Sequence, residues 1–190
     1  MKIINLSETD SILNQYVSEI RNVEVQNDRL RFRRNIERIG EVMAYEMSKT
    51  FAYSVKEIQT PLGIAPVRTP DNPLVISTIL RAGLPFHQGF LSYFDYAENA
   101  FVSAYRKSTK DGKFTVKVEY ISCGDLEGKV LLLVDPMLAT GSSLVLAYKA
   151  LCEKGGTPKY THVAAVIASE QGIDLSLIHI SEPTRLLSIS

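Results

Sequence analysis

The 190-residue sequence has few cysteines, no net charge and no long hydrophobic run. The 2 cysteines, Cys123 and Cys152, do not have metal-ligand spacing and therefore favour reduced thiols over a disulfide framework. The 21 basic residues balance 21 acidic ones, which argues against a global field that attracts nucleic acid or an anionic membrane. No apolar run approaches the roughly 20 residues of a membrane helix, and the N-terminus lacks a signal-peptide pattern. We therefore expect a soluble cytoplasmic protein with neither nucleic acid nor membrane among its partners.

What the sequence does contain is enough apolar residue content, 45%, to build the core of one compact domain. Short apolar, partly β-branched runs are typical of strands covered on both faces, and they occupy residues 74–80, 100–105, 129–135 and 162–169. Helical stretches are predicted between several of them, at 83–93 and 142–153, with Gly155 available as a left-handed cap of the second. This alternation predicts an α/β fold with a central, mostly parallel sheet flanked by helices.

Three further elements are predicted outside this alternation. A long amphipathic N-terminal helix begins behind Asn27 or Asp28, and its arginines are interpreted as a solvated face without a function. Its apolar stripe comprises Phe32, Ile36, Ile39, Met43 and Met47. The prolines and glycine of residues 54–73 indicate a hairpin arm or long connection. Residues 113–122 alternate as an edge or hairpin strand does, with Val116, Val118 and Tyr120 on one face.

The stretch VDPMLATGSS, residues 134–143, joins a buried strand to a helix start. In open α/β sheets ligands bind at the carboxyl ends of the strands, where the first turn of a helix presents unpaired N–H groups. Gly141 permits close approach of a ligand, and the neighbouring hydroxyl groups and the helix dipole favour a phosphate. Taken alone, the loop is equally compatible with a tight turn in which Thr140 or Ser142 merely caps the helix.

Asp135 stands at the end of the strand, a few residues before this candidate phosphate cradle. Its carboxylate can accept hydrogen bonds from sugar hydroxyls or contact a metal ion. An acid beside a phosphate cradle indicates a sugar phosphate as ligand. The loop has neither the lysine of a P-loop nor the three glycines of a dinucleotide site.

Five segments, in order, resemble those of the uracil phosphoribosyltransferase family. VDPMLATGSS is similar to the family's loop for phosphoribosyl diphosphate (PRPP), and ILRAGL, residues 79–84, to its pyrophosphate loop. AYRK, residues 104–107, resembles its second arginine segment, and MAYE and TPLG resemble its N-terminal helix and arm. The similarity runs from about Leu13 to Asp174.

The resemblance implies a type I phosphoribosyltransferase-like fold and a glycosyltransferase-class enzyme. Such an enzyme makes uridine monophosphate (UMP) and pyrophosphate from uracil and PRPP, in pyrimidine salvage. It implies Mg²⁺ bound mainly through PRPP, no metal site made by the protein alone, and a homodimer or larger homo-oligomer. The PRPP-binding residues it implies are Arg81, Arg106, Asp135, Pro136, Met137, Leu138, Ala139, Thr140, Gly141, Ser142 and Ser143.

The chemistry explains why arginines and an acid are expected as catalytic residues. Cleavage between ribose C1 and the diphosphate develops positive charge on the sugar and negative charge on the leaving group. Because a guanidinium is permanently charged and grips phosphate oxygens in pairs, Arg81 and Arg106 are expected to converge on the diphosphate from neighbouring strand ends. Asp135 is expected to hold the ribose hydroxyls, and Gly83 to allow close backbone approach or to ease a turn.

The family resemblance stops near residue 174, and residues 175–185, LSLIHISEPTR, resemble a translated sequencing adapter. We therefore expect an incomplete phosphoribosyltransferase domain at 1–174 and a non-native tail at 175–190, so that activity of this chain is open. No residue can be assigned to uracil recognition, because the family's uracil-reading loop has no counterpart. Alternatives are a phosphoribosyltransferase for another base, a non-catalytic PRPP-binding regulator, or a generic phosphate-binding domain.

Overall fold

The computed structural model describes residues 2–71, 73–108, 114–180 and 184–188, of which 2, 105–108, 114–117 and 184–187 are described by their backbone alone. In chain order the elements are β1 (Lys2–Asn5), the 3-10 turn η1 (Leu6–Glu8), α1 (Ile12–Arg21), α2 (Arg29–Ser48), β2 (Tyr53–Thr60), β3 (Gly63–Pro70), β4 (Leu74–Leu80), α3 (Leu84–Leu91), β5 (Glu98–Ser108), β6 (Phe114–Ser122), β7 (Val130–Val134), β8 (Met137–Leu138), α4 (Ser142–Gly155), β9 (Tyr160–Ala165), β10 (Ile167–Ala168), α5 (Glu170–His179) and β11 (Thr184–Ser188).

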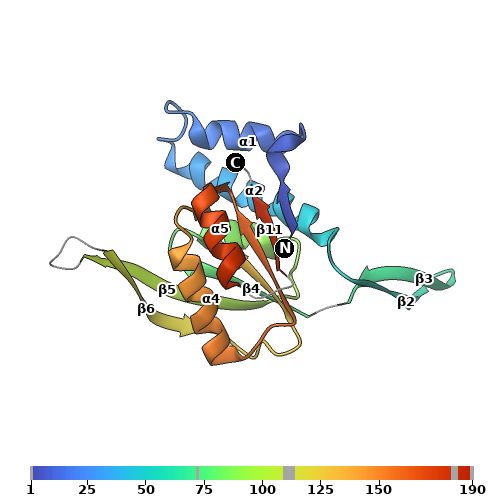
Figure 1. The fold of residues 1–190 in the computed structure, drawn as a ribbon. Coiled ribbons are helices and arrows are strands. Elements are labelled where there is room, and N and C mark those ends of the chain that lie inside the picture. Colours follow the sequence, from blue (N-terminus) through green and yellow to red (C-terminus); the bar gives the residue numbers. More distant parts are fainter. Residues whose placement is uncertain (1, 72, 109–113, 181–183, 189–190) are drawn as a thin grey trace.

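Within these ranges the main sheet has seven strands in the order β1-β11-β9-β7-β4-β5-β6. All neighbouring strands are parallel except the edge pair of β5 and β6. The helices lie on both faces of the sheet (Figure 1). The predicted α/β fold with a mostly parallel central sheet is therefore confirmed.

The core has two parts because successive side chains of a strand point to opposite faces. On β4, Leu74 and Ile76 belong to the cluster under α1, α2 and α3, whereas Val75 belongs to the cluster under α4. β7 repeats this division, and all five of its residues are buried. Burial on both faces explains why these central strands are continuous apolar runs in the sequence.

Helix α2 confirms the predicted N-terminal helix and its cap. The Asp28 carboxylate accepts hydrogen bonds from the backbone N–H groups of Leu30 and Arg31, both at 3.0 Å. The predicted apolar stripe is buried from Ile36 to Met47, but Phe32 is 37% exposed. Phe32 differs because it faces an apolar chamber described below rather than the sheet.

The β2–β3 hairpin confirms the predicted arm. Its strands pair from Tyr53 with Pro70 to Thr60 with Gly63, and the ribbon projects away from the sheet (Figure 1). Leu62, at its turn, is fully exposed.

The edge strand β6 is confirmed, but its predicted common face is wrong. Tyr120 pairs with Ser103 and Val118 with Ala104, so a bulge places one extra residue on β6 between them. Because adjacent residues of β5 face opposite sides, the bulge puts Val118 against the α4-side cluster and leaves Tyr120 58% exposed. Val116 lies outside the residues whose side chains are described.

Three boundaries also differ from the sequence-based predictions. The left-handed residue at the end of α4 is Gly156, with φ of 86°, because Gly155 still belongs to the helix and is packed against Gly124. The strand predicted at 162–169 divides into β9 and β10. Helix α5 crosses the predicted boundary between 174 and 175, and β11 pairs with β9 and β1. Whether residues 175–190 are a native segment stays a prediction.

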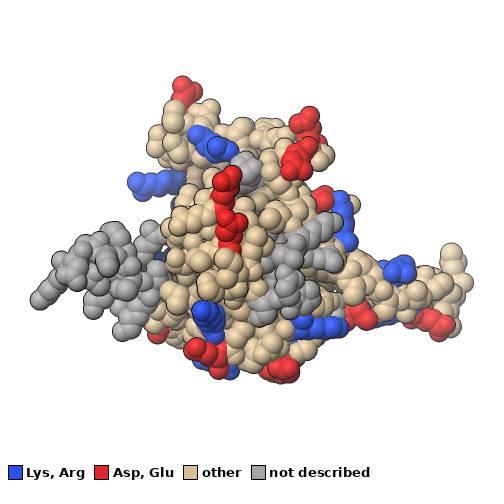
Figure 2. Space-filling model, viewed as in Figure 1, with Lys and Arg blue, Asp and Glu red and all other residues tan. Residues whose placement is uncertain are grey.

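Charge is distributed as the composition indicates. On the face shown in Figure 2, basic and acidic side chains are scattered and do not form a region of one sign. Among the described residues, none of the helices combines the length and apolarity that a membrane span requires.

Candidate active site

The loop singled out in the sequence leaves the carboxyl end of central strand β7. Asp135 follows the last residue of β7, and its backbone N–H donates to the Ala164 carbonyl on β9 at 3.1 Å. The chain then forms the short strand β8 and reaches α4 at Ser142. Thus residues 135–143 form one continuous rim at the strand ends, where ligands of open α/β sheets bind.

Gly141 directly precedes helix α4, and the start of this helix differs from the turn-and-cap alternative. Gly141 has φ of 76°, in the left-handed region that glycine adopts without strain. Among the described residues no side chain caps this helix, and the hydroxyls of Thr140 and Ser142 instead lie 3.2 Å apart. The first-turn N–H groups therefore have no intrahelical or capping partner, which leaves them available to an anion.

Two residues at the start of α5, Ser169 and Gly172, contact the loop backbone, and sequence analysis did not single them out. β8 and β10 pair in parallel, and the Ser169 backbone N–H donates to the Leu138 carbonyl at 2.9 Å. The Ser169 hydroxyl also donates to the Ala139 carbonyl. A Cβ on Gly172 would lie 2.6 Å from that same carbonyl oxygen, so only glycine permits this approach of α5. The start of α5 thereby holds the loop backbone at Leu138 and Ala139.

Arg81 comes directly after β4, the neighbour of β7 in the sheet, and its side chain is exposed. A short hydrogen-bonded turn follows, in which the Leu84 N–H donates to the Arg81 carbonyl at 3.2 Å. This turn leads into α3, whose first residues are again without a side-chain cap in the described chain. The structure thus places Arg81 and the loop of Asp135 at adjacent strand ends.

Thr78 and Gly83 connect these two loops. The Thr78 hydroxyl, buried on β4, donates to the Val134 carbonyl at 2.7 Å, directly before Asp135. A Cβ on Gly83 would lie 1.9 Å from the same hydroxyl oxygen. Gly83 is therefore required for close packing within the protein, with an ordinary φ of −74°. Neither role is visible in sequence spacing, because both depend on contact between strands.

Arg106 is located only by its backbone. It lies on β5, opposite Val116 of β6 and beyond the end of β4, whose Leu80 pairs with Ser103. Its side chain lies outside the described residues. Convergence of Arg81 and Arg106 on one ligand therefore stays a prediction.

Asp135 has a distinctive electrostatic environment. Burial raises the pKa of its carboxyl from 3.8 to about 7, because desolvation disfavours the charged form. Near neutral pH the group can therefore exist in both protonation states. A protonated carboxyl donates one hydrogen bond and accepts others, which suits the hydroxyls of a sugar.

Two hollows meet at this loop. The loop pocket, of about 230 Å³, is lined by residues 135–141 together with Ser143, Leu144, Ile79 and Ala82. The apolar chamber, of about 760 Å³, lies on the other side of Met137 and has Arg81 in its wall. Both hollows share Ala82, Pro136 and Met137, so they are neighbours across a common wall. Ser142 instead lines a third, open hollow with α5.

The loop has one carboxylate suited to a cation, that of Asp135. In the described part of the chain, no group of three or more metal-ligating side chains is assembled. One carboxylate fits Mg²⁺, which commonly takes one or two protein carboxylates and completes its shell with substrate oxygens and water. The residues present thus fit a magnesium ion carried by a diphosphate.

Comparison with solved structures identifies the fold. The chain superimposes with a TM-score of 0.54 on a purine phosphoribosyltransferase from Pyrococcus horikoshii, with 14% identity over 81% of this chain and 82% of the other. A TM-score of 0.85 relates it to the AQ2163 protein of Aquifex aeolicus, with 23% identity over 98% of this chain and 85% of the other. Fold and loop together define a protein of the type I phosphoribosyltransferase fold.

Sequence similarity is more specific than the fold. Residues 7–184 match the family model described as uracil phosphoribosyltransferase. A uracil phosphoribosyltransferase from Porphyromonas gingivalis is 58% identical over 174 residues, which are 92% of this chain and 80% of that protein. The chain belongs to the uracil phosphoribosyltransferase family, a family of glycosyltransferase-class enzymes. The family match extends on both sides of residue 174.

Proposed function

We propose that this chain transfers the phosphoribosyl group of PRPP to uracil, which yields UMP and pyrophosphate for pyrimidine salvage. Family membership supports the reaction, and the loop after β7 supports PRPP as donor. The observation that carries the assignment is the uncapped start of α4 on the same loop as Asp135. It combines an anion-binding helix terminus with a group that hydrogen-bonds a sugar.

In this proposal the 5-phosphate of PRPP binds at the start of α4. Backbone N–H groups of the first turn donate to phosphate oxygens, and the helix dipole adds a favourable field. Hydroxyl groups of the loop provide further donors, and the backbone of Pro136, Met137 and Leu138 forms the adjoining wall. The contributing residues are Ala139, Thr140, Gly141, Ser142 and Ser143.

The ribose and diphosphate lie further along the rim. Asp135 binds the ribose hydroxyls, and Arg81 and Arg106 bind the diphosphate, whose negative charge grows as the C1–oxygen bond breaks. Mg²⁺ bound to PRPP, with Asp135 as its protein contact, supplies further neutralisation of the diphosphate. The protein thereby fixes both ends of PRPP while the bond between them lengthens.

Uracil, in this proposal, reaches ribose C1 from the apolar chamber. The chamber adjoins the loop pocket through Pro136 and Met137, and a planar base suits its apolar walls. Its volume of about 760 Å³ exceeds that of the loop pocket, so it has room for an acceptor beside bound PRPP. The hydrogen-bonding groups that read the base are not assigned.

UMP formation from uracil, PRPP and Mg²⁺ tests the assignment, measured by chromatography with Arg81→Ala and Arg106→Ala as variants. Each variant is expected to lower kcat/KM by roughly 10³-fold, because a charge that stabilises the leaving group is lost. Arg29→Ala removes an exposed arginine at the start of α2 and should be neutral. A kcat/KM that stays at the wild-type level in both arginine variants would refute the assigned roles. PRPP binding without UMP formation would instead favour a non-catalytic regulator.

The arm supports a second proposal, that two copies of the chain associate. A two-stranded ribbon is at best marginally stable alone, and this one exposes apolar side chains at Val55, Ile58, Leu62, Ile64 and Val67. A homodimer or larger homo-oligomer would cover them. Sedimentation velocity should show an assembly larger than the 21.2 kDa chain, and Leu62→Asp combined with Ile64→Asp should dissociate it. A monomeric wild type contradicts this proposal.

We also propose a cytoplasmic location. It is supported by Cys123 and Cys152, both free and partly buried thiols, as expected in a reducing compartment.

A further inference from the structure

The apolar chamber owes one of its walls to the packing of α1 against α2. Ile20 and Arg21, at the end of α1, contribute to this wall, as do Phe32 and Ile36 from α2. Met137 of the loop also lines the chamber. The width of the chamber therefore depends on how α1 and α2 sit relative to one another.

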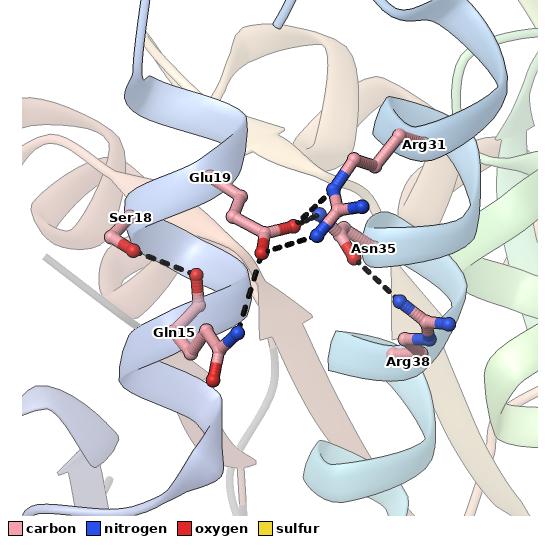
Figure 3. A network of polar contacts seen from close by, with 6 residues as sticks. All are labelled: Gln15, Ser18, Glu19, Arg31, Asn35 and Arg38. Carbon is pink, nitrogen blue, oxygen red and sulfur yellow. Dashed lines mark hydrogen bonds and ion pairs between the residues drawn. The ribbon is translucent and has the colours of Figure 1, made fainter. Parts of the chain in front are cut away.

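A polar network joins these two helices beside the chamber (Figure 3). The Glu19 carboxylate on α1 accepts two hydrogen bonds from the Arg31 guanidinium on α2, both at 2.8 Å. It also accepts a 2.6 Å hydrogen bond from the side-chain amide of Asn35, one turn further along α2. Bidentate arginine–carboxylate pairs fix direction as well as distance. Glu19 thus ties α1 to two successive turns of α2.

The network is partly shielded from solvent and is extended by a second connection. The Glu19 side chain is only 14% exposed, and Asn35 is buried. Asn35 accepts a hydrogen bond from Arg38 at 3.1 Å, and the Arg38 guanidinium lies 5.5 Å from the ring centre of Tyr16 on α1. Hydrogen bonding by Arg31 and Asn35 lowers the pKa of Glu19 to about 2, so the carboxylate stays ionised throughout the neutral range.

The three residues at the centre of the network each directly precede a residue of the chamber wall. Glu19 precedes Ile20, Arg31 precedes Phe32, and Asn35 precedes Ile36. A displacement of these residues therefore reaches the chamber wall through a single peptide bond. We infer that Glu19 is a positioning residue: through Arg31 and Asn35 it sets the width of the chamber that receives the acceptor base. This inference rests on the proposed function, in which uracil occupies the chamber.

Removal of an ion pair that only stabilises the fold should not change KM for one substrate alone. The chain contains a second ion pair that serves as a matched control. Arg34 and Glu37 form an ion pair at 2.7 Å, with side chains 57% and 19% exposed, close to the 52% and 14% of Arg31 and Glu19. That pair lies within α2 and joins no second helix. Glu37→Ala thus removes a similar ion pair without releasing α1.

Steady-state kinetics with uracil and PRPP varied separately tests the inference, alongside thermal unfolding of each variant. Glu19→Ala should raise KM for uracil about tenfold while KM for PRPP stays within about twofold, because only the acceptor side is displaced. Glu19→Gln keeps hydrogen-bond acceptors and should recover part of the loss; it also decides the matter if Glu19→Ala does not fold. Glu37→Ala should leave both constants unchanged.

The outcomes separate two kinds of failure. Equal changes of both KM values in Glu19→Ala, or an unchanged KM for uracil in a folded protein, overturn the positioning role while the proposed function stands. A wild-type chain that forms no UMP refutes the proposed function and, with it, this inference.

Discussion

The helices of this protein begin in two different ways. At α1, α2 and α5 a side chain caps the first turn: Ser11 accepts from Leu13, Asp28 from Leu30, and Ser169 from Gly172. At α3 and α4 the residue before the helix is a glycine, and no side chain of the described chain caps either one. The uncapped starts are the ones that directly follow the two loops with Arg81 and Asp135.

Under the proposed function, this difference distinguishes helix starts that are stabilised by a side chain from those beside the PRPP site. A side-chain cap satisfies an N–H group and contributes about 1 kcal/mol to stability. Without a cap, the N–H groups and the positive end of the helix dipole remain available to a phosphate. The start of α4 therefore lacks the stabilisation of a cap and leaves its first-turn N–H groups open to the phosphate proposed above, whereas at α3 the Leu84 N–H already donates to the Arg81 carbonyl. Loss of a capping side chain should lower the unfolding free energy, whereas an acid placed at the uncapped start of α4 should leave it unchanged or raise it slightly.

The largest effect is expected when an acid is placed at the uncapped start of α4. Ser143→Asp puts a negative charge in its first turn, which favours the helix dipole but repels the 5-phosphate. PRPP affinity should fall by roughly 10²-fold or more, with unchanged or slightly raised stability. Titration calorimetry and thermal unfolding measure both quantities. Ser143→Asn, neutral and of similar size, is the control, and equal losses in both variants would argue that size alone matters.

Asp135→Asn should separate stability from activity. Because its folded pKa is raised to about 7 from 3.8, the folded state binds more protons than the unfolded state between these values. The unfolding free energy therefore falls as pH rises through this window and stays lower above it. Asn removes the penalty, so the variant should gain a few kcal/mol above about pH 7 and lose roughly 10²-fold in kcat/KM.

Urea unfolding at about pH 5 and about pH 8 checks this, because the gain of Asp135→Asn should be clearly larger at the higher value, where the whole pKa difference contributes. A variant that is destabilised at both would mean that the carboxylate has a stabilising partner.

Gly83→Ala tests the close packing at the other uncapped helix. An added Cβ would collide with the Thr78 hydroxyl, which holds the Val134 carbonyl. Overpacking of this kind costs about 1–3 kcal/mol. Thr78→Ala removes the colliding oxygen, so the double variant should be less destabilised than the sum of the single variants in chemical unfolding. Strict additivity would contradict the contact.

The smallest effect is expected at a capped helix start. Asp28→Ala deletes the acceptor of two N–H groups at α2 and should lower the unfolding free energy by about 1 kcal/mol. KM for PRPP should not change, since α2 begins far from the loop in the chain and contributes no residue to the loop pocket. A change in KM for PRPP would contradict the prediction that the capped start of α2 takes no part in PRPP binding.

Local patterns accounted for much of the fold and for the centre of the site. The apolar runs of β4 and β7 and the cap at Asp28 are legible in sequence because burial on both faces and capping each act over a few neighbouring residues. The loop from Asp135 to Ser143 is legible for the same reason, since strand end, glycine and helix start are contiguous. The family resemblance identified the same loop.

Features that depend on contacts between distant segments were not predictable. The β6 bulge reversed the face of Tyr120, and a contact with Gly124 kept Gly155 within α4. Likewise, Ser169, the cap of α5, hydrogen-bonds to Ala139, which lies 30 residues earlier in the chain. In each case the neighbouring sequence permits more than one conformation.

The sequence by itself determined the alternation of the central strands and helices and, through its motifs, the family, and it predicted a sugar phosphate as the ligand of the loop. Those properties follow from local periodicity and from residues adjacent in the chain. Only the tertiary structure decided that Thr78 and Gly83 join the two loops, that Asp135 is buried enough to titrate near neutrality, and that Glu19 ties α1 to α2. Desolvation and close packing arise when segments distant in sequence meet, so no local pattern carries them.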